Sequence, residues 1–360
     1  MSVSGSSAFE FRNSPMQYIQ IGAYQHMDRQ VLHVKALQRM GNVLECEGDY
    51  DASGVALQRA LDQAKSTTQR AGILNDVAWV MMRKGDIGAA QDLSEQALQL
   101  CDEIKDSERL RAQIFDHLGT FAEKRGEVED AILFHQRSRK IKEDQGDTFG
   151  VLESANNLGS TYQLAGQDTK ALEEFEYCLA LSKQVGYALG IATAMLNIGN
   201  VHEFRGEFEK ATACYEDALH LFDNINHQPG SALCLGNLGA LFQQMHQNEK
   251  ARYFLDKALA LNQALGDQEG LAHSKTWLAQ NLLEDAELVP AQKEAQSALE
   301  CAEQANSFEQ TAYARRILAR VLRAQHNETA AVQEYKIALS LFEQLGNISE
   351  ANTVRRELHI

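Results

Sequence analysis

Three asparagines recur at equal spacing, and their side chains could bind a polypeptide backbone. Asn157, Asn197 and Asn237 lie 40 residues apart, and each precedes an aliphatic residue and a glycine. The tip of an asparagine side chain has one acceptor and two donors, so it can hydrogen-bond both the N–H and the C=O of one peptide unit. A row of such amides would hold an extended chain without recognising its side chains. The alternative interpretation is that these asparagines cap or bridge neighbouring helices.

Three arginines near the end of the chain could bind an anion. Arg316, Arg320 and Arg323 have the spacing i, i+4, i+7 and would share one face of a helix. Guanidinium groups on one face repel one another unless an anion is present, so a carboxylate or a phosphate is the expected ligand. The alternative is a solvated face on which nearby glutamates pair with the arginines.

No pattern of residues indicates catalysis. Val201–Arg205 reads VHEFR and lacks the second histidine of the H-E-x-x-H zinc motif. There is no Walker loop and no G-x-S-x-G or G-x-G-x-x-G fingerprint, and the 11 histidines lack ligand spacing. The six cysteines form no C-x-x-C pair and are interpreted as buried residues in a reducing compartment. These features predict a cytoplasmic protein that is not an enzyme and has no cofactor or metal.

Charge and hydropathy narrow the class of partner. The formal net charge is −16, which argues against nucleic acid because an acidic chain repels phosphate. The sequence has no run of eighteen apolar residues and no secretory signal at its start, so we expect no membrane association. A protein or a peptide segment remains as the expected partner, and the sequence does not predict an oligomeric state.

A repeat explains the spacing of the asparagines. The sequence contains eight repeated units, and each has a small residue at the same position. In the first five units, a glycine follows this small residue by seven positions, which indicates a turn between two helices. A further column, at the end of the second helix, contains only Gly and Asn, which tolerate the left-handed conformation at a helix end. The recurring small residues are Gly41, Ala78, Gly119, Gly159, Gly199, Gly239, Ala279 and Ala319, and the closing column is Gly146, Gly186, Asn226, Gly266, Asn306 and Gly346.

The repeated unit resembles the tetratricopeptide repeat. Asn157–Leu181 reads NLGSTYQLAGQDTKALEEFEYCLAL, with an aliphatic-small pair, Tyr162, the turn residue Gly166 and Phe175 at the positions of that family. The unit is about six residues longer than the common form and lacks its final proline, which is similar to the long-unit subgroup of spindle-orientation scaffolds, kinesin light chains and Rap-type peptide receptors. The resemblance implies an all-α, right-handed superhelical solenoid of eight helical hairpins over residues 29–346.

Both ends of the chain are expected to cap this array. Residues 1–28 are interpreted as a disordered tail followed by a short capping helix, since serine and proline, as at Ser14 and Pro15, are residue types favoured at the N-cap and the first position of a helix. Residues 347–360 are predicted to form a C-terminal capping helix whose apolar residues share one face: Ile348, Ala351, Val354 and Leu358.

The resemblance also implies a concave groove lined by the first helix of each hairpin. The family's groove positions, counted from the small residue, place the three repeated asparagines on one groove surface together with the other candidate binding residues. Trp79 and Trp277 are expected to be exposed anchors for partner side chains, and the alternative is a tryptophan packed between units. The candidate peptide-binding residues are Asn156, Asn157, Asn197, Asn200, Asn237, Trp79, Phe204, Trp277, Arg316, Arg320 and Arg323.

Charge along the groove predicts an orientation for the ligand. The third unit offers Asp116 and Glu123, whereas the eighth offers the three arginines. An extended ligand would then lie with its basic part near the third unit and its acidic part or C-terminal carboxylate near the eighth.

Three functions fit this sequence. The first is a scaffold that holds an extended or disordered partner segment through the asparagine row. The second is a regulatory receptor that binds a small peptide signal and changes the curvature of the solenoid, although such receptors usually carry an N-terminal effector domain and about 28 residues precede the first repeat here. The third, a heat-shock-chaperone cofactor with a carboxylate clamp, is least favoured. Lys35 and Lys124 lie in the groove, but the clamp positions hold Gln38 and Asp116.

Overall fold

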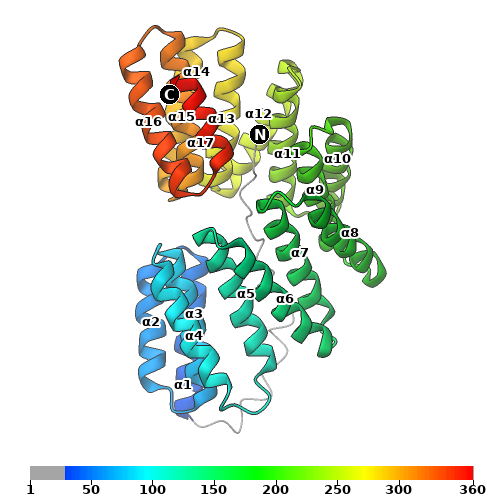
Figure 1. The fold of residues 1–360 in the computed structure, drawn as a ribbon, viewed down its shortest axis with the longest axis vertical. Helices are drawn as coiled ribbons and strands as arrows, with labels where there is room; N and C mark the ends of the chain where they lie inside the picture. The colour runs from blue at the N-terminus through cyan, green and yellow to red at the C-terminus, as the bar shows by residue number, and fades with distance from the viewer. Residues whose placement is uncertain (1–28, 360) are drawn as a thin grey trace. The chain divides into compact units, whose positions relative to one another are not determined.

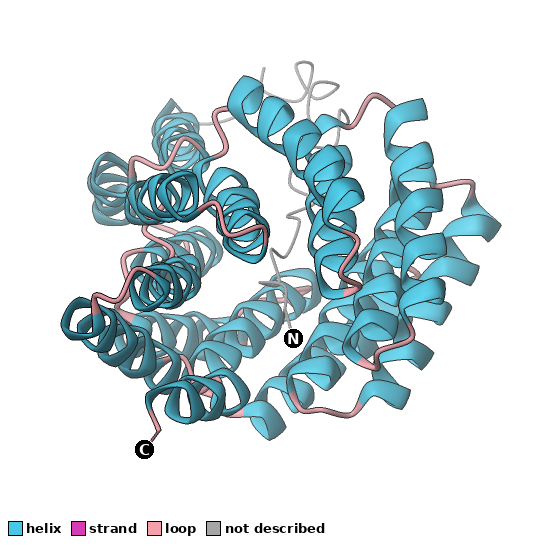
Figure 2. Cartoon of the chain, turned by 90° about the horizontal axis from the view of Figure 1, so that it is seen from above, coloured by secondary structure: helices cyan, strands magenta, loops and turns pink. Residues whose placement is uncertain are grey.

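All regular secondary structure in the described residues, 29–359 of the computed structural model, is helical (Figures 1 and 2). This confirms the predicted all-α fold. The expected tail and capping helix of residues 1–28 lie outside the described residues. The helices are α1 (Arg29–Cys46), α2 (Tyr50–Gln63), α3 (Thr67–Arg83), α4 (Ile87–Cys101), α5 (Glu108–Arg125), α6 (Val128–Asp144), α7 (Thr148–Leu164), α8 (Asp168–Val185), α9 (Ala188–Phe204), α10 (Phe208–Asn224), α11 (Gln228–Gln244), α12 (Asn248–Leu265), α13 (Gln268–Glu284), α14 (Leu288–Gln304), α15 (Phe308–Ala324), α16 (Glu328–Gln344) and α17 (Ile348–Leu358).

The helices form eight successive pairs, from α1 and α2 to α15 and α16, and α17 follows the last pair. The chain divides into two compact units, an N-terminal unit that ends at Gln167 and a C-terminal unit that begins at Asp168. Within each unit, a helix packs against the next helix in the chain, and the first helices of neighbouring hairpins also contact one another. The first helices therefore form a continuous row in each unit, and this row positions the candidate binding residues.

Small residues allow the two helices of a hairpin to approach closely. The recurring small residue of every first helix is buried, and a larger side chain sixteen residues later often packs on it. A Cβ atom at Gly199 would lie 2.6 Å from the ring of Tyr215, and one at Gly239 would lie 2.6 Å from the side chain of Leu255. The column of small residues thus sets the distance between paired helices.

We expect Gly199→Ala to destabilise the C-terminal unit by about 1–3 kcal/mol, because the added methyl group overlaps the buried ring of Tyr215. Urea unfolding would measure this change. Gly236→Ala in α11 is the matched control. A Cβ there has His273 as its nearest neighbour at 3.4 Å, an ordinary contact, so the gain in helix propensity should leave stability unchanged or raise it by up to about 1 kcal/mol. Equal losses in both variants would contradict this packing.

Residues in the left-handed conformation close the helices. All six residues of the predicted closing column have φ values between 52° and 70°, which confirms the prediction. The turn inside the later hairpins reaches the same conformation without glycine, at His246, Ala286 and His326, with φ values of 56°, 60° and 62°. An L-residue with a side chain pays about 1–2 kcal/mol for this conformation, so these turns hold backbone strain.

Ala286→Gly is expected to raise the free energy of unfolding by about 0.5–1 kcal/mol, because Ala286 is exposed and the change acts on the backbone alone. Ala305→Gly is the control, since Ala305 ends α14 in the right-handed conformation, at φ −75°. Glycine relieves no backbone strain at that position, so this substitution should leave the free energy of unfolding unchanged or lower it. Thermal unfolding of the two variants would show the difference, and a loss of stability in Ala286→Gly would contradict the assignment of strain.

The C-terminal helix α17 packs against the last hairpin. Its Ala351 and Val354 are buried in a cluster with Tyr335 and Phe342 of α16. By contrast, Ile348 at the start of the helix is 71% exposed. Apolar contacts on one side therefore hold α17, and its charged residues reach α15, as described below.

Candidate peptide-binding surfaces

The candidate site is the first-helix surface, which we define as the face of the first helices that the second helices do not cover. In the C-terminal unit, Asn197 and Asn200 of α9 and Asn237 of α11 are predicted to lie on it, and all three are half-buried. The Oδ1 atom of Asn200 accepts hydrogen bonds from Nδ2 of Asn237 at 3.0 Å and from the hydroxyl of Tyr215 at 2.8 Å. This pair of asparagines bridges α9 and α11, as in the alternative interpretation of the sequence.

The bridge leaves hydrogen-bonding capacity on Asn237. An amide group has two N–H donors and an acceptor oxygen, and Asn237 uses one donor, while its Oδ1 accepts no bond from the described residues.

A neighbouring network of hydrogen bonds fixes the geometry of the bridge between Asn200 and Asn237. The Tyr215 hydroxyl shares its single proton between Oδ1 of Asn200 and the nearer carboxylate of Glu203, at 2.6 Å, and Glu203 also accepts from Nε2 of Gln244 at 2.6 Å. Burial first, and the charge of Glu203 second, raise the pKa of Tyr215 well above its usual value, so the hydroxyl stays protonated and donates.

Two further candidates, Asn156 and Asn157, lie on α7 in the N-terminal unit and are half-buried. The backbone carbonyl of Asn157 accepts a hydrogen bond from the hydroxyl of Thr161 at 2.8 Å. Its side-chain amide makes no hydrogen bond to the described residues, so both its donors and its acceptor are available. Since α7 and α9 belong to different units, a single row of asparagines through all the repeats stays a prediction.

Two of the predicted aromatic residues remain partly accessible. Phe204 and Trp277 are half-buried. The indole N–H of Trp277 donates to Nε2 of His273 at 3.2 Å. Burial lowers the pKa of His273 to about 4, which keeps this ring neutral and able to accept. Trp277 is therefore held at one edge by a hydrogen bond while part of its ring stays exposed.

The prediction of an exposed Trp79 is wrong. Its side chain is only 7% exposed and belongs to the apolar core of the N-terminal unit. The indole N–H donates to Oε1 of the buried Glu45 at 3.0 Å, and the ring lies 4.6 Å from that of His117. Because α1 supplies an acceptor at this depth, the polar edge of the indole needs no contact with water.

At Arg316 and Arg323 the structure shows the alternative interpretation, in which glutamates pair with the arginines, and an anion site at all three arginines stays a prediction. Arg316 donates through Nε and Nη2 to both carboxylate oxygens of Glu357, at 3.0 and 2.8 Å, and through Nη1 to Glu350 at 2.7 Å. Arg323 binds Glu328 and the backbone carbonyl of Glu357, and Arg320 donates to Gln280. Two carboxylates of α17 therefore pair with Arg316, while Glu328 of α16 pairs with Arg323.

The acidic residues of the third hairpin are neutralised in a similar way. Asp116 is 8% exposed and accepts from Nζ of Lys142 at 2.6 Å. The ring nitrogens of the buried His135 lie 3.7 Å from Asp116 and 3.6 Å from Glu123. Burial alone would lower the pKa of His135, but the two carboxylates outweigh it and raise this pKa to about 9. The carboxylates of the third hairpin and Arg316 of the eighth are thus paired internally, and the predicted orientation of a ligand stays a prediction.

The described residues contain no group of histidine, cysteine and carboxylate side chains that could hold a metal ion. The six cysteines are free thiols, and Cys46 alone among them is exposed. No helix in the described part of the chain is both long and apolar enough to cross a membrane.

A family model and several solved structures match this chain. The family model for the tetratricopeptide repeat matches residues 150–224 and 190–264. A comparison with curated proteins found no match. The similar solved structures include three that cover most of this chain. A tetratricopeptide repeat protein from Parabacteroides merdae is 14% identical, with a TM-score of 0.57 over 81% of this chain and 99% of its own. Aspartyl phosphate phosphatase F from Bacillus subtilis is 14% identical, with a TM-score of 0.66 over 91% of this chain and 87% of its own.

The third is the Rap conjugation gene regulator of the plasmid pLS20 in complex with a Phr peptide. It is 15% identical, with a TM-score of 0.61 over 88% of this chain and 97% of its own. Identities this low establish a shared fold and nothing further about activity. The chain thus carries tetratricopeptide repeats over residues 150–264, within a helical array that has the fold of tetratricopeptide repeat proteins.

Proposed function

We propose that this chain is a non-enzymatic binding protein that holds an extended or disordered segment of a partner on its first-helix surface through asparagine side chains. The observation that carries the proposal is the state of Asn237. Its amide is held in place by one hydrogen bond to Asn200 and keeps an N–H and a carbonyl oxygen for a ligand. A positioned amide with spare groups can bind one peptide unit of an extended chain at both its N–H and its C=O.

The surroundings of Asn237 support this proposal. The bridge to Asn200 is braced by Tyr215 and Glu203, so the amide loses little conformational freedom when a ligand binds. Half-buried Trp277 on the next first helix, α13, offers apolar surface for a partner side chain. The regulator of pLS20, which was solved with a peptide, shares the fold.

Selection of linear peptides from a display library against the full chain would test this function. Hydrogen exchange of the complex should then show slower exchange in α9, α11 and α13, the first helices that carry Asn197, Asn237 and Trp277. The second helices should be unaffected. Failure to enrich any linear peptide, or protection confined to the second helices, would contradict the proposal.

A second candidate is a receptor for a small peptide signal that responds by changing the curvature of the helical array. The similarity of fold to a regulator solved with a peptide favours it. Solution scattering of the full chain with and without a selected peptide would separate the two candidates. A receptor should change its radius of gyration when the peptide binds, whereas a rigid scaffold should keep it.

A further inference from the structure

One position of the repeat, three residues before the recurring small residue, has a side chain in every first helix except α11. Its residues are Gln38, Asn75, Asp116, Asn156, Leu196, Gly236, Thr276 and Arg316. Several of these side chains bind a neighbouring helix. In α3, for example, Oδ1 of Asn75 pairs with Nδ1 of His117 on the next first helix, α5, at 3.0 Å. Gly236 of α11 has no side chain with which to make such a contact with α13.

His273 is the residue of α13 that lies against Gly236. A Cβ atom at Gly236 would lie 3.4 Å from Nδ1 of His273 and 3.7 Å from Cε1 of the same ring. The Nδ1 atom makes no hydrogen bond to the described residues, whereas Nε2 accepts from the indole N–H of Trp277 at 3.2 Å. One nitrogen of this half-buried ring is therefore bonded within the chain, and the other, on the side of α11, keeps its hydrogen-bonding capacity.

The contact with Trp277 decides which nitrogen of His273 carries the proton. An indole N–H can only donate, so the Nε2 atom that accepts from it is the unprotonated nitrogen. Burial lowers the pKa of His273 to about 4, so the ring is neutral at neutral pH and has a single N–H group. This N–H group is therefore at Nδ1, beside Gly236, the residue that directly precedes Asn237 in the chain.

We propose that His273 is a further peptide-binding residue, whose Nδ1–H donates to a backbone carbonyl oxygen of the bound segment. The proposal rests on the proposed function and adds a second main-chain contact to that of Asn237. Because Gly236 has no side chain, the backbone of a ligand can come close to the ring. A neutral donor suits the carbonyl oxygen of a peptide unit, whereas a carboxylate would favour a cation.

The position of the proton can be measured without a ligand. Nitrogen NMR of the histidine rings in the full chain should show His273 protonated at Nδ1 and unprotonated at Nε2 at neutral pH. The signals of His273 are identified by their absence in His273→Gln. Trp277→Phe should relax this preference, because it removes the donor to Nε2. A proton on Nε2 in the unaltered chain would overturn the proposal.

The affinity for a library-selected linear peptide tests the contact itself. In His273→Gln, the side-chain amide can reach the former position of Nε2 but leaves no donor at Nδ1, so binding should weaken about two- to tenfold, the contribution of one hydrogen bond. His273→Asn keeps a donor near the position of Nδ1 and should lose less affinity than His273→Gln. His220→Gln is the control, since His220 is exposed on the second helix α10, and it should leave the affinity unchanged.

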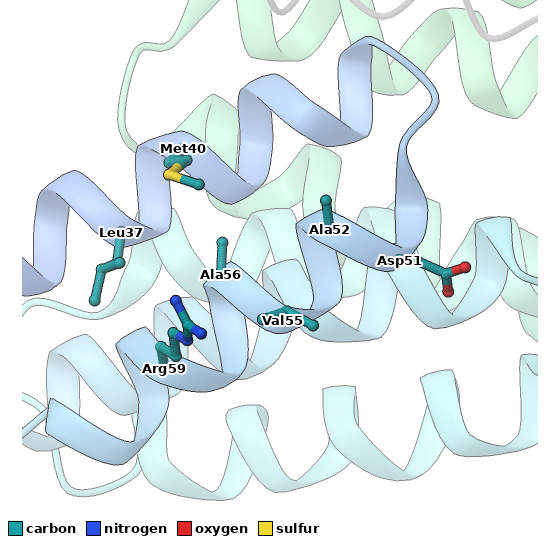
Figure 3. A pocket seen from close by; sticks show the side chains of 7 residues that line it. All are labelled: Leu37, Met40, Asp51, Ala52, Val55, Ala56 and Arg59. Carbon is teal, nitrogen blue, oxygen red and sulfur yellow. The ribbon is translucent and has the colours of Figure 1, made fainter.

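A second place for a linear peptide is the pocket between α1 and α2 in the N-terminal unit (Figure 3). Leu37 and Met40 of α1 and Val55 of α2 line it, so much of its wall is apolar. Met40→Ala should leave the affinity of the selected peptide unchanged. A loss of affinity in Met40→Ala without one in His273→Gln would overturn the proposal.

Asn237→Ala separates a failure of this inference from a failure of the proposed function. Loss of affinity in both Asn237→Ala and His273→Gln supports the contact at His273. A peptide that loses affinity in Asn237→Ala but not in His273→Gln overturns the role of His273 and leaves the proposed function standing. A peptide whose affinity is unchanged in both variants contradicts both.

Discussion

Replacing Arg316 with methionine is expected to lower the free energy of unfolding by about 3–5 kcal/mol, because it leaves two carboxylates without their cation. The side chain of Arg316 is 17% exposed, and those of Glu350 and Glu357 are 4% and 22% exposed. Burial raises the pKa of Glu350, whereas the positive charge of Arg316 lowers it. The charged form of this buried carboxylate is therefore stabilised by Arg316. Urea unfolding followed by helical circular dichroism would measure the loss.

Arg355→Met is the matched control for this prediction. Arg355 lies on α17, the helix that carries both carboxylate partners of Arg316, and pairs with Glu343 at 2.6 Å, but both side chains of this pair are well exposed, at 39% and 47%. Exposed pairs contribute at most about 1 kcal/mol, so this variant should unfold almost like the unaltered chain. Equal effects of the two substitutions would mean that Arg316 does not hold α17.

The N-terminal unit should lose stability as the pH rises from about 6.5 to about 9. His135 binds a proton more tightly in the folded state, where its pKa is raised to about 9, than in the unfolded state, where it is about 6.5. Below the lower value both states are protonated and the contribution is complete, and it disappears as the pH passes the higher value. A difference of this size corresponds to roughly 3 kcal/mol.

Comparison with His135→Gln isolates this contribution from that of every other titrating group. The charged groups around His135 are Asp116 and Glu123 of α5, Lys142 of α6 and, beside Lys142, Glu153 of α7. The variant should unfold with a much flatter dependence on pH. A slope that is the same in both proteins would show that His135 is neutral in the folded state.

The repeat could be predicted from the sequence because it depends on local chemistry. Small residues at fixed intervals are favoured where two helices approach closely, and Gly or Asn is favoured where a helix ends in the left-handed conformation. Positions such as Gly199 and Asn226 therefore indicate helix pairing without any knowledge of distant contacts. The later turns at Ala286 and His326 show that a repeat can keep this conformation even where its usual glycine is missing.

The charged contacts could not be predicted in the same way, because they join residues that are far apart in the sequence. Arg316 pairs with Glu350 and Glu357, which lie on a helix outside the repeats. The burial of Trp79 depends in turn on Glu45 of the preceding hairpin. One residue in the sequence does indicate a buried polar contact. His135 occupies the position sixteen residues after Gly119, where other hairpins have Leu57, Tyr215 and Leu255. A polar residue there indicates a buried partner.

The affinity of a library-selected linear peptide for the Asn157→Ala, Asn197→Ala, Asn237→Ala triple variant tests the central claim most directly. A hydrogen-bonded asparagine contributes roughly 0.5–1.5 kcal/mol, so loss of all three should weaken binding by about 10- to 1,000-fold. Asn224→Ala is the control, since Asn224 is an exposed asparagine on the second helix α10. Fluorescence anisotropy would measure each dissociation constant. If the folded triple variant binds the peptide as tightly as the unaltered chain, these asparagines hold the helices together and do not hold a partner.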